Sequence, residues 1–158
     1  MRGPGGIEDW LGLSEAGLYC VPGAFHIDPH RAVERAVITH GHADHARPGH
    51  KHVLATSETL AVMRQRYGNK AGGVQQALGL GEAIDINGVG LSLAPAGHVL
   101  GSAQVVLEWN GQRAVVSGDY KRAADPTCTP FEIVPCDLFS LLGIQAGEKR
   151  KPSMIKIT

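Results

Sequence analysis

One stretch of seven residues, Thr39-His40-Gly41-His42-Ala43-Asp44-His45, constrains the fold more than any other part of the chain. It places four metal-binding side chains within six positions. The run before it, residues 35–39, is apolar and partly β-branched, as a buried strand is. Alternate side chains of an extended segment point the same way, so His40 and His42 can reach one ion. If the chain then turns, Asp44 and His45 can serve a second ion, and the pattern predicts a two-metal site.

The donor types favour zinc, because imidazole nitrogen and carboxylate oxygen are both usual zinc ligands. Manganese and iron are the alternatives. The competing interpretation is a solvated, histidine-rich turn that binds nothing. The metal site is favoured because four specified residues stand at fixed offsets behind a strand.

Composition limits the class of protein. The 158 residues are 43% hydrophobic and 19% charged, as in a single globular domain with a real core. Fifteen basic residues balance fifteen acidic ones, so any contact with nucleic acid must be local. The cysteines, Cys20, Cys128 and Cys136, are odd in number and lack Cys-x-x-Cys spacing, which argues against a disulfide framework and a thiolate zinc site. The chain shows no signal-peptide core or membrane-span pattern, so we expect a cytoplasmic protein.

Local patterns predict one helix and several strands. Residues 57–67 have helical spacing, with Ser57 placed to cap the helix and Gly68 to end it. Asn87-Gly88 and Asn110-Gly111 each separate two strand-like runs, as hairpin turns do. Residues 69–82 are glycine-rich without a clean period, so we expect a loop with one helical turn near 74–78. The expected strand pairs are 18–21 with 24–27, 83–86 with 89–93, and 103–109 with 112–116.

Three further residues can join the metal motif. His98 lies between the two predicted hairpins and Asp119 lies just past the second, so each can reach the motif from a neighbouring strand end. Asp28 ends a predicted strand, where an aspartate is either a turn former or a carboxylate that orients a histidine ligand. His50 and His52 repeat the His-x-His spacing without a following Asp-His. We expect them at the surface, outside the site.

The pattern His40-x-His42-x-Asp44-His45 resembles the signature of the metallo-β-lactamase fold hydrolases. The segments 97–102 (Gly-His-Val-Leu-Gly-Ser) and 117–121 (Ser-Gly-Asp-Tyr-Lys) resemble that family as well. The surrounding sequence, from about Gly17 to Phe139, is similar to one branch, the bacterial ligase-associated DNA exonucleases. These are β-CASP relatives, also described as mRNA 3′-end-processing-factor-like. The resemblance implies an α/β (α+β) fold, the N-terminal part of an αββα sandwich, with a mixed β-sheet and helices on one face.

The resemblance also implies roles for the motif residues. His40, His42 and His98 would bind a first zinc ion, Asp44 and His45 a second, and Asp119 would bridge them. Asp44 and Asp119 would be the catalytic residues, and Asp28 would support the metal loop from behind. The implied activity is metal-dependent hydrolysis of phosphodiesters in single-stranded or end-containing DNA, or in RNA. This is a role in DNA repair or RNA processing, in association with a DNA ligase or helicase system.

Neither end of the chain shares the resemblance. We expect a poorly defined segment over 1–16, a partial metallo-β-lactamase domain over 17–139, and a disordered tail over 140–158. The family pattern continues beyond Phe139 where this chain does not, so we expect a truncated chain without the β-CASP insertion and the last histidine ligand. One well-formed metal site and doubtful activity would follow. An apolar sheet face, including Val37, Leu91, Leu93, Val105, Leu107 and Val115, would then be left partly uncovered and favour self-association.

Two other functions stay open at this stage. The same ligands with another pocket would suit a small-molecule metallohydrolase, such as a glyoxalase-II-like thioesterase. A chain without the family's remaining sequence could instead bind metal and be catalytically inactive. The fit of segments 97–102 and 119–121 to β-CASP nucleases favours the nuclease.

Overall fold

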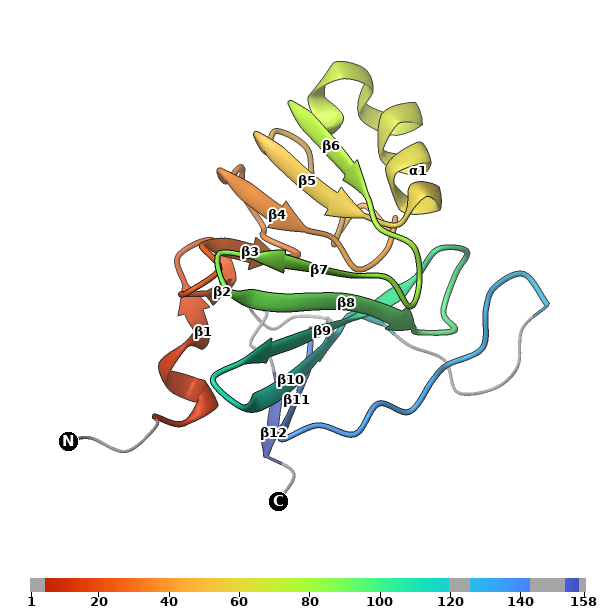
Figure 1. Ribbon diagram of the computed structural model, residues 1–158. Helices are drawn as coiled ribbons and strands as arrows, with labels where there is room; N and C mark the ends of the chain where they lie inside the picture. Colours follow the sequence, from red (N-terminus) through yellow and green to blue (C-terminus); the bar gives the residue numbers. More distant parts are fainter. Residues whose placement is uncertain (1–4, 120–125, 143–152, 157–158) are drawn as a thin grey trace.

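Two six-stranded β-sheets lie face to face, and one α-helix packs on the outer face of the first sheet (Figure 1). This computed structural model describes residues 5–119, 126–142 and 153–156. The α+β class, the mixed sheets and the helix on one face agree with the fold class predicted from the sequence.

The first sheet has the strand order β1-β2-β3-β4-β5-β6. Strands β1 to β3 pair antiparallel, and β3 to β6 pair parallel. The pairing of β2 with β3 confirms the strand pair expected at 18–27. Its elements, with the short 3-10 turns beside them, are η1 Ile7–Asp9, β1 Leu11–Ser14, β2 Gly17–Cys20, β3 Phe25–Ile27, β4 Arg35–Val37, β5 His52–Ala55, α1 Ser57–Tyr67, η2 Gly68–Ala71 and β6 Val74–Ala77.

The second sheet contains both predicted hairpins, in the order β12-β11-β10-β9-β8-β7. Asn87 and Gly88 have positive φ angles of 52° and 89°, and Asn110 and Gly111 have 53° and 73°. Positive φ at both central residues is what a type I′ hairpin turn requires, so the Asn-Gly pairs explain both hairpins. The strands are β7 Ala83–Ile86, β8 Val89–Pro95, β9 Ala103–Trp109, β10 Gln112–Ser117, β11 Leu138–Leu141 and β12 Ser153–Lys156.

Helix α1 occupies the predicted residues, but its N-cap is Thr56 rather than Ser57. The Thr56 hydroxyl accepts the backbone N–H of Thr59, which satisfies one of the free donors of the first turn. Leu60 and Met63 are buried against Ala36, Ile38, Val53 and Ala55 on the outer face of the first sheet. The helix therefore fixes the back of strands β4 and β5, from which the metal motif continues.

The segment around residues 74–78 differs from the expectation. It forms the edge strand β6, parallel to β5, instead of a helical turn. Val74, Gln76 and Ala77 are exposed, so the strand lacks the alternation of apolar residues that marks a half-buried strand. Pairing with β5 determines its conformation. Because β5 lies before helix α1 in the sequence, the local pattern of residues 74–78 does not reveal this pairing.

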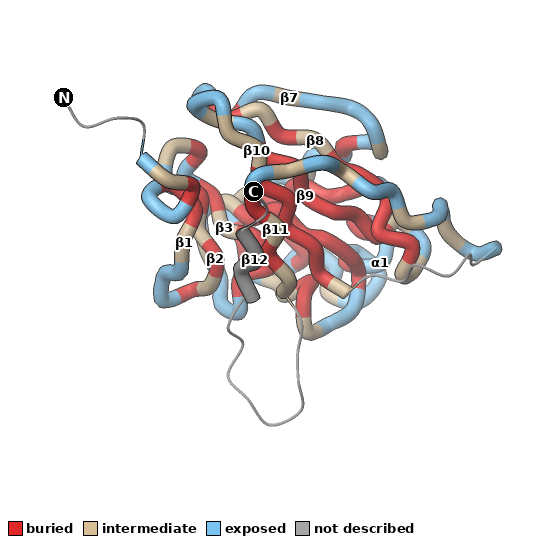
Figure 2. Tube along the Cα trace, turned by 90° about the horizontal axis from the view of Figure 1, so that it is seen from below, coloured by how far each residue is buried: buried red, intermediate tan, exposed pale blue. Residues whose placement is uncertain are grey.

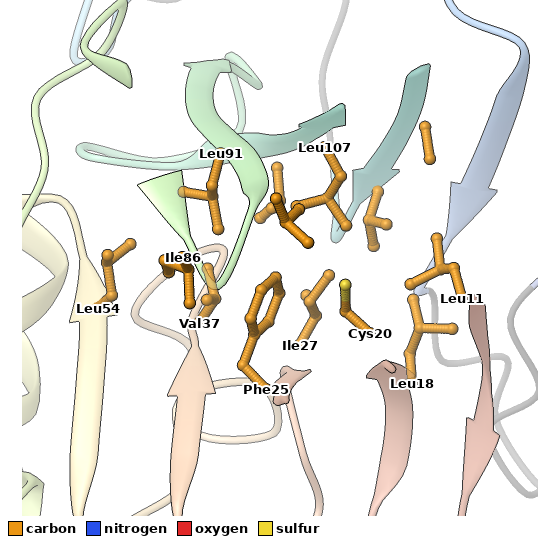
Figure 3. Close-up of a cluster of buried hydrophobic side chains, with 14 of the residues drawn as sticks. Leu11, Leu18, Cys20, Phe25, Ile27, Val37, Leu54, Ile86, Leu91 and Leu107 are labelled. Carbon is orange, nitrogen blue, oxygen red and sulfur yellow. The ribbon is translucent and has the colours of Figure 1, made fainter. Parts of the chain in front are cut away.

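The core between the two sheets is closed by the chain itself (Figure 3). Phe25, Ile27 and Val37 of the first sheet face Leu91 and Leu107 of the second, and all five are at most 1% exposed. The prediction that this apolar sheet face is left partly uncovered is therefore wrong for the residues named. Figure 2 shows buried residues along β9 and β10, in the middle of the second sheet.

Val115 lies on the outer face of the second sheet, where Val134, Cys136 and Phe139 pack over it. The irregular segment before β11 thus covers part of this face. No helix among the described residues is long and apolar enough to cross a membrane.

Both ends of the chain contribute strands. Residues 11–14, expected to be poorly defined, form β1 and pair with β2. Residues 153–156, expected within a disordered tail, form β12 and pair antiparallel with β11. The other residues of the expected tail beyond Leu142 lie outside the described residues. A strand therefore lies within each of these two end segments.

Candidate metal centre

The residues singled out from the sequence lie on loops that leave strand ends in both sheets. Asp28 follows β3, His40 follows β4, His98 follows β8 and Asp119 follows β10. The backbone N–H of Ala103, at the start of β9, donates to the carbonyl of Thr39 at 2.8 Å. This bond joins the two sheets directly beside the metal motif, so the loops converge on one point.

A first group of four ligand atoms comes from His40, His42, His98 and Asp119, all within 4.8 Å of one another. His42 Nδ1 and His98 Nε2 are 3.2 Å apart. Asp119 Oδ2 is 3.6 Å from His40 Nε2 and 3.8 Å from His98 Nε2. Four ligands placed tetrahedrally about 2.1 Å from a zinc ion lie about 3.4 Å from one another. The spacing therefore fits the edges of one tetrahedral site.

A second group shares Asp119 with the first. His45 Nε2 lies 3.6 Å from Asp44 Oδ2 and 3.7 Å from Asp119 Oδ2. The same oxygen of Asp119 thus faces nitrogens of His40, His98 and His45. A single carboxylate oxygen between two groups of donors is in position to bridge two ions.

Burial distinguishes this cluster from a solvated histidine-rich turn. The side chains of His40 and His45 are fully buried, and the Nε2 atom of each finds no hydrogen-bond partner among the described residues. A buried polar atom left unpaired costs on the order of 1–3 kcal/mol. Both atoms point toward Asp119, where a cation would satisfy them. The donor set therefore fits a divalent metal.

Asp28 supports the loop and is not available as a ligand. Its Oδ1 accepts the backbone N–H of Thr39 at 2.8 Å. Its Oδ2 accepts the Thr39 hydroxyl at 2.6 Å and faces His45 Nδ1 at 2.7 Å. Although its oxygens lie near His40 and His45, they are already engaged. The backbone of Asp28 is left-handed, with φ of 46°.

Thr39 is a residue that the sequence argument missed. Its hydroxyl contacts Asp28 on one side and His40 Nδ1, at 3.0 Å, on the other. Gly118 packs directly against it, since a Cβ atom at position 118 would lie 2.4 Å from Thr39 Oγ1. The sequence offered one signal for this role of Thr39, which is a residue with a hydroxyl group at the strand end immediately before His40.

Helix α1 braces the metal loop from outside. Arg66 donates to the carbonyl of Gly41 at 2.8 Å, and Tyr67 donates to the carbonyl of Ala46 at 2.8 Å. A Cβ atom at Gly41 would lie 3.0 Å from a methyl of Val62, so the loop fits closely on the helix. Helix α1 therefore also helps to hold the loop that carries His40 and His42.

The loop that carries His98 is held by hydroxyl groups. Ser102 Oγ accepts the backbone N–H groups of His98 and Val99 at 3.1 and 3.2 Å. Thr56 donates from its hydroxyl to the carbonyl of Gly101 at 2.7 Å. The N-cap of α1 thus holds the His98 loop as well.

The buried histidines differ in pKa. Burial, assisted by the neighbouring rings of His45, His42 and His98, lowers the pKa of His40 to about 3 against the pull of Asp28. Burial also lowers the pKa of His98, although Asp119 opposes it. For His45 the penalty of burial is outweighed by its hydrogen bond to Asp28 and by nearby carboxylates, which together raise its pKa. His40 is therefore a neutral ligand at ordinary pH.

His50 corrects one expectation. It was predicted at the surface, but it is 2% exposed, and its Nδ1 accepts the backbone N–H of Val33 at 3.2 Å. His52, in strand β5, is half-buried. Neither belongs to the groups of ligand atoms that could hold a metal among the described residues.

Curated proteins of two kinds share extended similarity with this chain. A probable DNA ligase of Opitutus terrae is 33% identical over 120 residues, which cover 72% of this chain and 12% of the ligase. Endoribonuclease YSH1 of Eremothecium gossypii is 36% identical over 80 residues, which cover 48% of this chain and 10% of that enzyme. The chain belongs to the metallo-β-lactamase fold family, in its β-CASP nuclease-like branch.

No family model matches this metallo-β-lactamase fold chain. Among solved structures, it is similar to a metallo-β-lactamase HARLDQ-motif mutant of Cronobacter sakazakii, with a TM-score of 0.45 and 16% identity. That alignment covers 60% of this chain and 44% of the other. The chain spans about a tenth of the length of the two curated relatives described above. The histidine and aspartate cluster described above can hold a divalent metal, as expected in a family of metal-dependent hydrolases and nucleases.

Proposed function

We propose that the chain is a phosphodiester hydrolase whose centre uses two zinc ions to activate water. The observation that carries the proposal is the position of Asp119 Oδ2. It lies 3.6 Å from the Nε2 atom of His40 and 3.7 Å from that of His45, two buried nitrogens that find no hydrogen-bond partner among the described residues. Such an arrangement suits a pair of ions that share one carboxylate.

His40, His42 and His98 would hold the first ion, Asp44 and His45 the second, and Asp119 both. Four donors make the first group complete, so we expect it to bind more tightly than the second. Once bound, the ions would lower the pKa of water and offset negative charge on the phosphate. The nitrogen and oxygen donors favour zinc over the harder divalent cations.

Residues of this chain orient the metal ligands and close one side of the site to solvent. His40 and His45 are buried and fixed from behind, while His42 is exposed and Asp44, His98 and Asp119 are partly so. The centre is therefore open on the side of His42. A substrate phosphate would approach from there, since the opposite side is closed by Asp28 and Thr39.

The relatives support a nucleic-acid substrate. One is named as a probable DNA ligase and another as an endoribonuclease. Single-stranded or end-containing DNA, or RNA, is accordingly the proposed substrate, in association with a DNA ligase or helicase system. The net charge of zero leaves recognition to local contacts near the site.

Cleavage assays test this proposal. The zinc-loaded chain is incubated with end-labelled single-stranded DNA, with RNA, and with bis-p-nitrophenyl phosphate. We expect cleavage that a chelator abolishes, that Asp119→Asn lowers at least 100-fold, and that His30→Ala leaves unchanged, because His30 is an exposed histidine outside the cluster. Hydrolysis of a glutathione thioester without any phosphodiester cleavage would instead identify a small-molecule metallohydrolase. Metal binding without either activity would indicate an inactive metal-binding chain.

A further inference from the structure

The hydroxyl of Thr39 lies between the carboxylate of Asp28 and the ring of His40, and all three residues are buried. We infer that Thr39 is a positioning residue that sets the tautomer of His40 and so prepares its Nε2 atom to bind metal. This inference rests on the metal centre proposed above. It assigns the task to a residue that contacts neither substrate nor metal.

The direction of the hydrogen bonds follows from counting protons. An ionised carboxylate only accepts, so the single hydrogen of the Thr39 hydroxyl goes to Asp28 Oδ2 at 2.6 Å. Thr39 Oγ1 can then only accept from His40 Nδ1, 3.0 Å away. Nδ1 of His40 therefore carries the hydrogen, and the lone pair of the neutral ring is on Nε2.

One carboxylate orients histidines of both ligand groups through this contact. Asp28 Oδ2 accepts directly from Nδ1 of His45 at 2.7 Å and reaches His40 through Thr39. The Nε2 atoms of both rings are consequently aimed at the same oxygen of Asp119. Without the hydroxyl, Asp28 would orient His45 alone.

The surroundings keep the Thr39 hydroxyl in place. The backbone of Thr39 is held on both sides, by Asp28 Oδ1 at its N–H and by the Ala103 N–H at its carbonyl. Gly118 leaves no space beside Oγ1, because even a Cβ atom would lie 2.4 Å away. The backbone bonds do not depend on the side chain, so a substitution at position 39 can remove the hydroxyl and leave the loop held.

The test compares Thr39→Val, which keeps the shape but removes the hydroxyl, with Thr39→Ser, which keeps the hydroxyl. Affinities for Zn²⁺ and Co²⁺ are measured by competition with a chelator, and the Co²⁺ d–d spectrum reports the coordination geometry. Loss of such an outer partner typically lowers metal affinity about 10–100-fold. We expect that loss and an altered cobalt spectrum for Thr39→Val, and values within about threefold of the unmodified chain for Thr39→Ser.

Circular dichroism and thermal melting of each metal-free variant report folding separately. Equal affinity and identical cobalt spectra for the unmodified chain and a folded Thr39→Val variant would overturn the inference. So would an equal loss in Thr39→Ser, since the hydroxyl would then not be the active feature. If the unmodified chain bound neither ion, the proposed metal centre itself would fail, which separates the two outcomes.

Discussion

Replacing Gly118 by alanine tests how closely the two sheets meet behind the metal site. The added Cβ atom would lie 2.4 Å from Thr39 Oγ1 and 3.1 Å from His40 Nδ1, whereas ordinary contacts of such an atom are 3.4–4 Å. Gly118 has no left-handed φ angle, so the backbone itself tolerates alanine. Either the Thr39 hydroxyl or the strand end of β10 must therefore move by about 1 Å.

Overpacking of this kind typically costs about 1–3 kcal/mol. For a chain of this length, each kcal/mol lowers the melting temperature by about 2–4 °C. We therefore expect the metal-free Gly118→Ala variant to melt about 2–12 °C below the unmodified chain. Its Zn²⁺ affinity should fall as well, because the atoms that must move are those that orient His40.

Gly90→Ala is the matched control. It lies in strand β8 of the same sheet, and its Cβ atom would meet Glu108 at an ordinary 3.6 Å. Removing a glycine from a strand stabilises by about 0.4–1 kcal/mol when the backbone suits alanine. Urea denaturation and zinc titration of both variants are the assays. If Gly118→Ala matched Gly90→Ala in both stability and zinc affinity, the argument for close packing at Thr39 would be refuted.

Two other predictions concern stability. Leu107→Ala removes a fully buried side chain between the sheets and should lower the free energy of unfolding by about 2–5 kcal/mol, measured by urea denaturation; a loss below about 1 kcal/mol would contradict a core closed by this chain. Metal-free protein should also lose stability as the pH falls below 6.5. In the unfolded chain His40 binds a proton as the pH falls through 6.5, whereas in the folded chain its pKa is lowered to about 3. Protonation of His40 therefore favours the unfolded chain between these two pH values. His98 and His50 act in the same direction and His45 opposes them. The net loss by pH 4.5 should be on the order of 2 kcal/mol and smaller in His40→Asn, and a pH-independent urea midpoint would contradict it.

The hairpins and helix α1 could be predicted because their signals are local. Asn87-Gly88 and Asn110-Gly111 adopt the left-handed conformations that their sequence favours. Strand β6 could not, because its exposed residues carry no alternation and its conformation depends on pairing with β5. The closed core was missed for a similar reason. Which sheet covers Leu91 and Leu107 depends on contacts far apart in sequence.

The candidate ligands could be predicted because the spacing of donor residues within 40–45 strongly restricts where their side chains can lie. The structure brings His98 and Asp119 to the same point. Thr39 could not be assigned from sequence, since its task follows from the direction of two hydrogen bonds rather than from its residue type. The burial of His50 could not be predicted from the sequence either, because its partner is the backbone N–H of Val33.

Every role proposed for the cluster around Asp119 depends on bound metal. The most direct measurement is the zinc content of the purified chain after removal of loosely bound ions, together with the Zn²⁺ affinity of the unmodified chain, His42→Ala and His30→Ala. We expect about one tightly held zinc in the unmodified chain and in His30→Ala, with most of it lost in His42→Ala. A folded, unmodified chain that holds no transition metal and binds none on titration would contradict it.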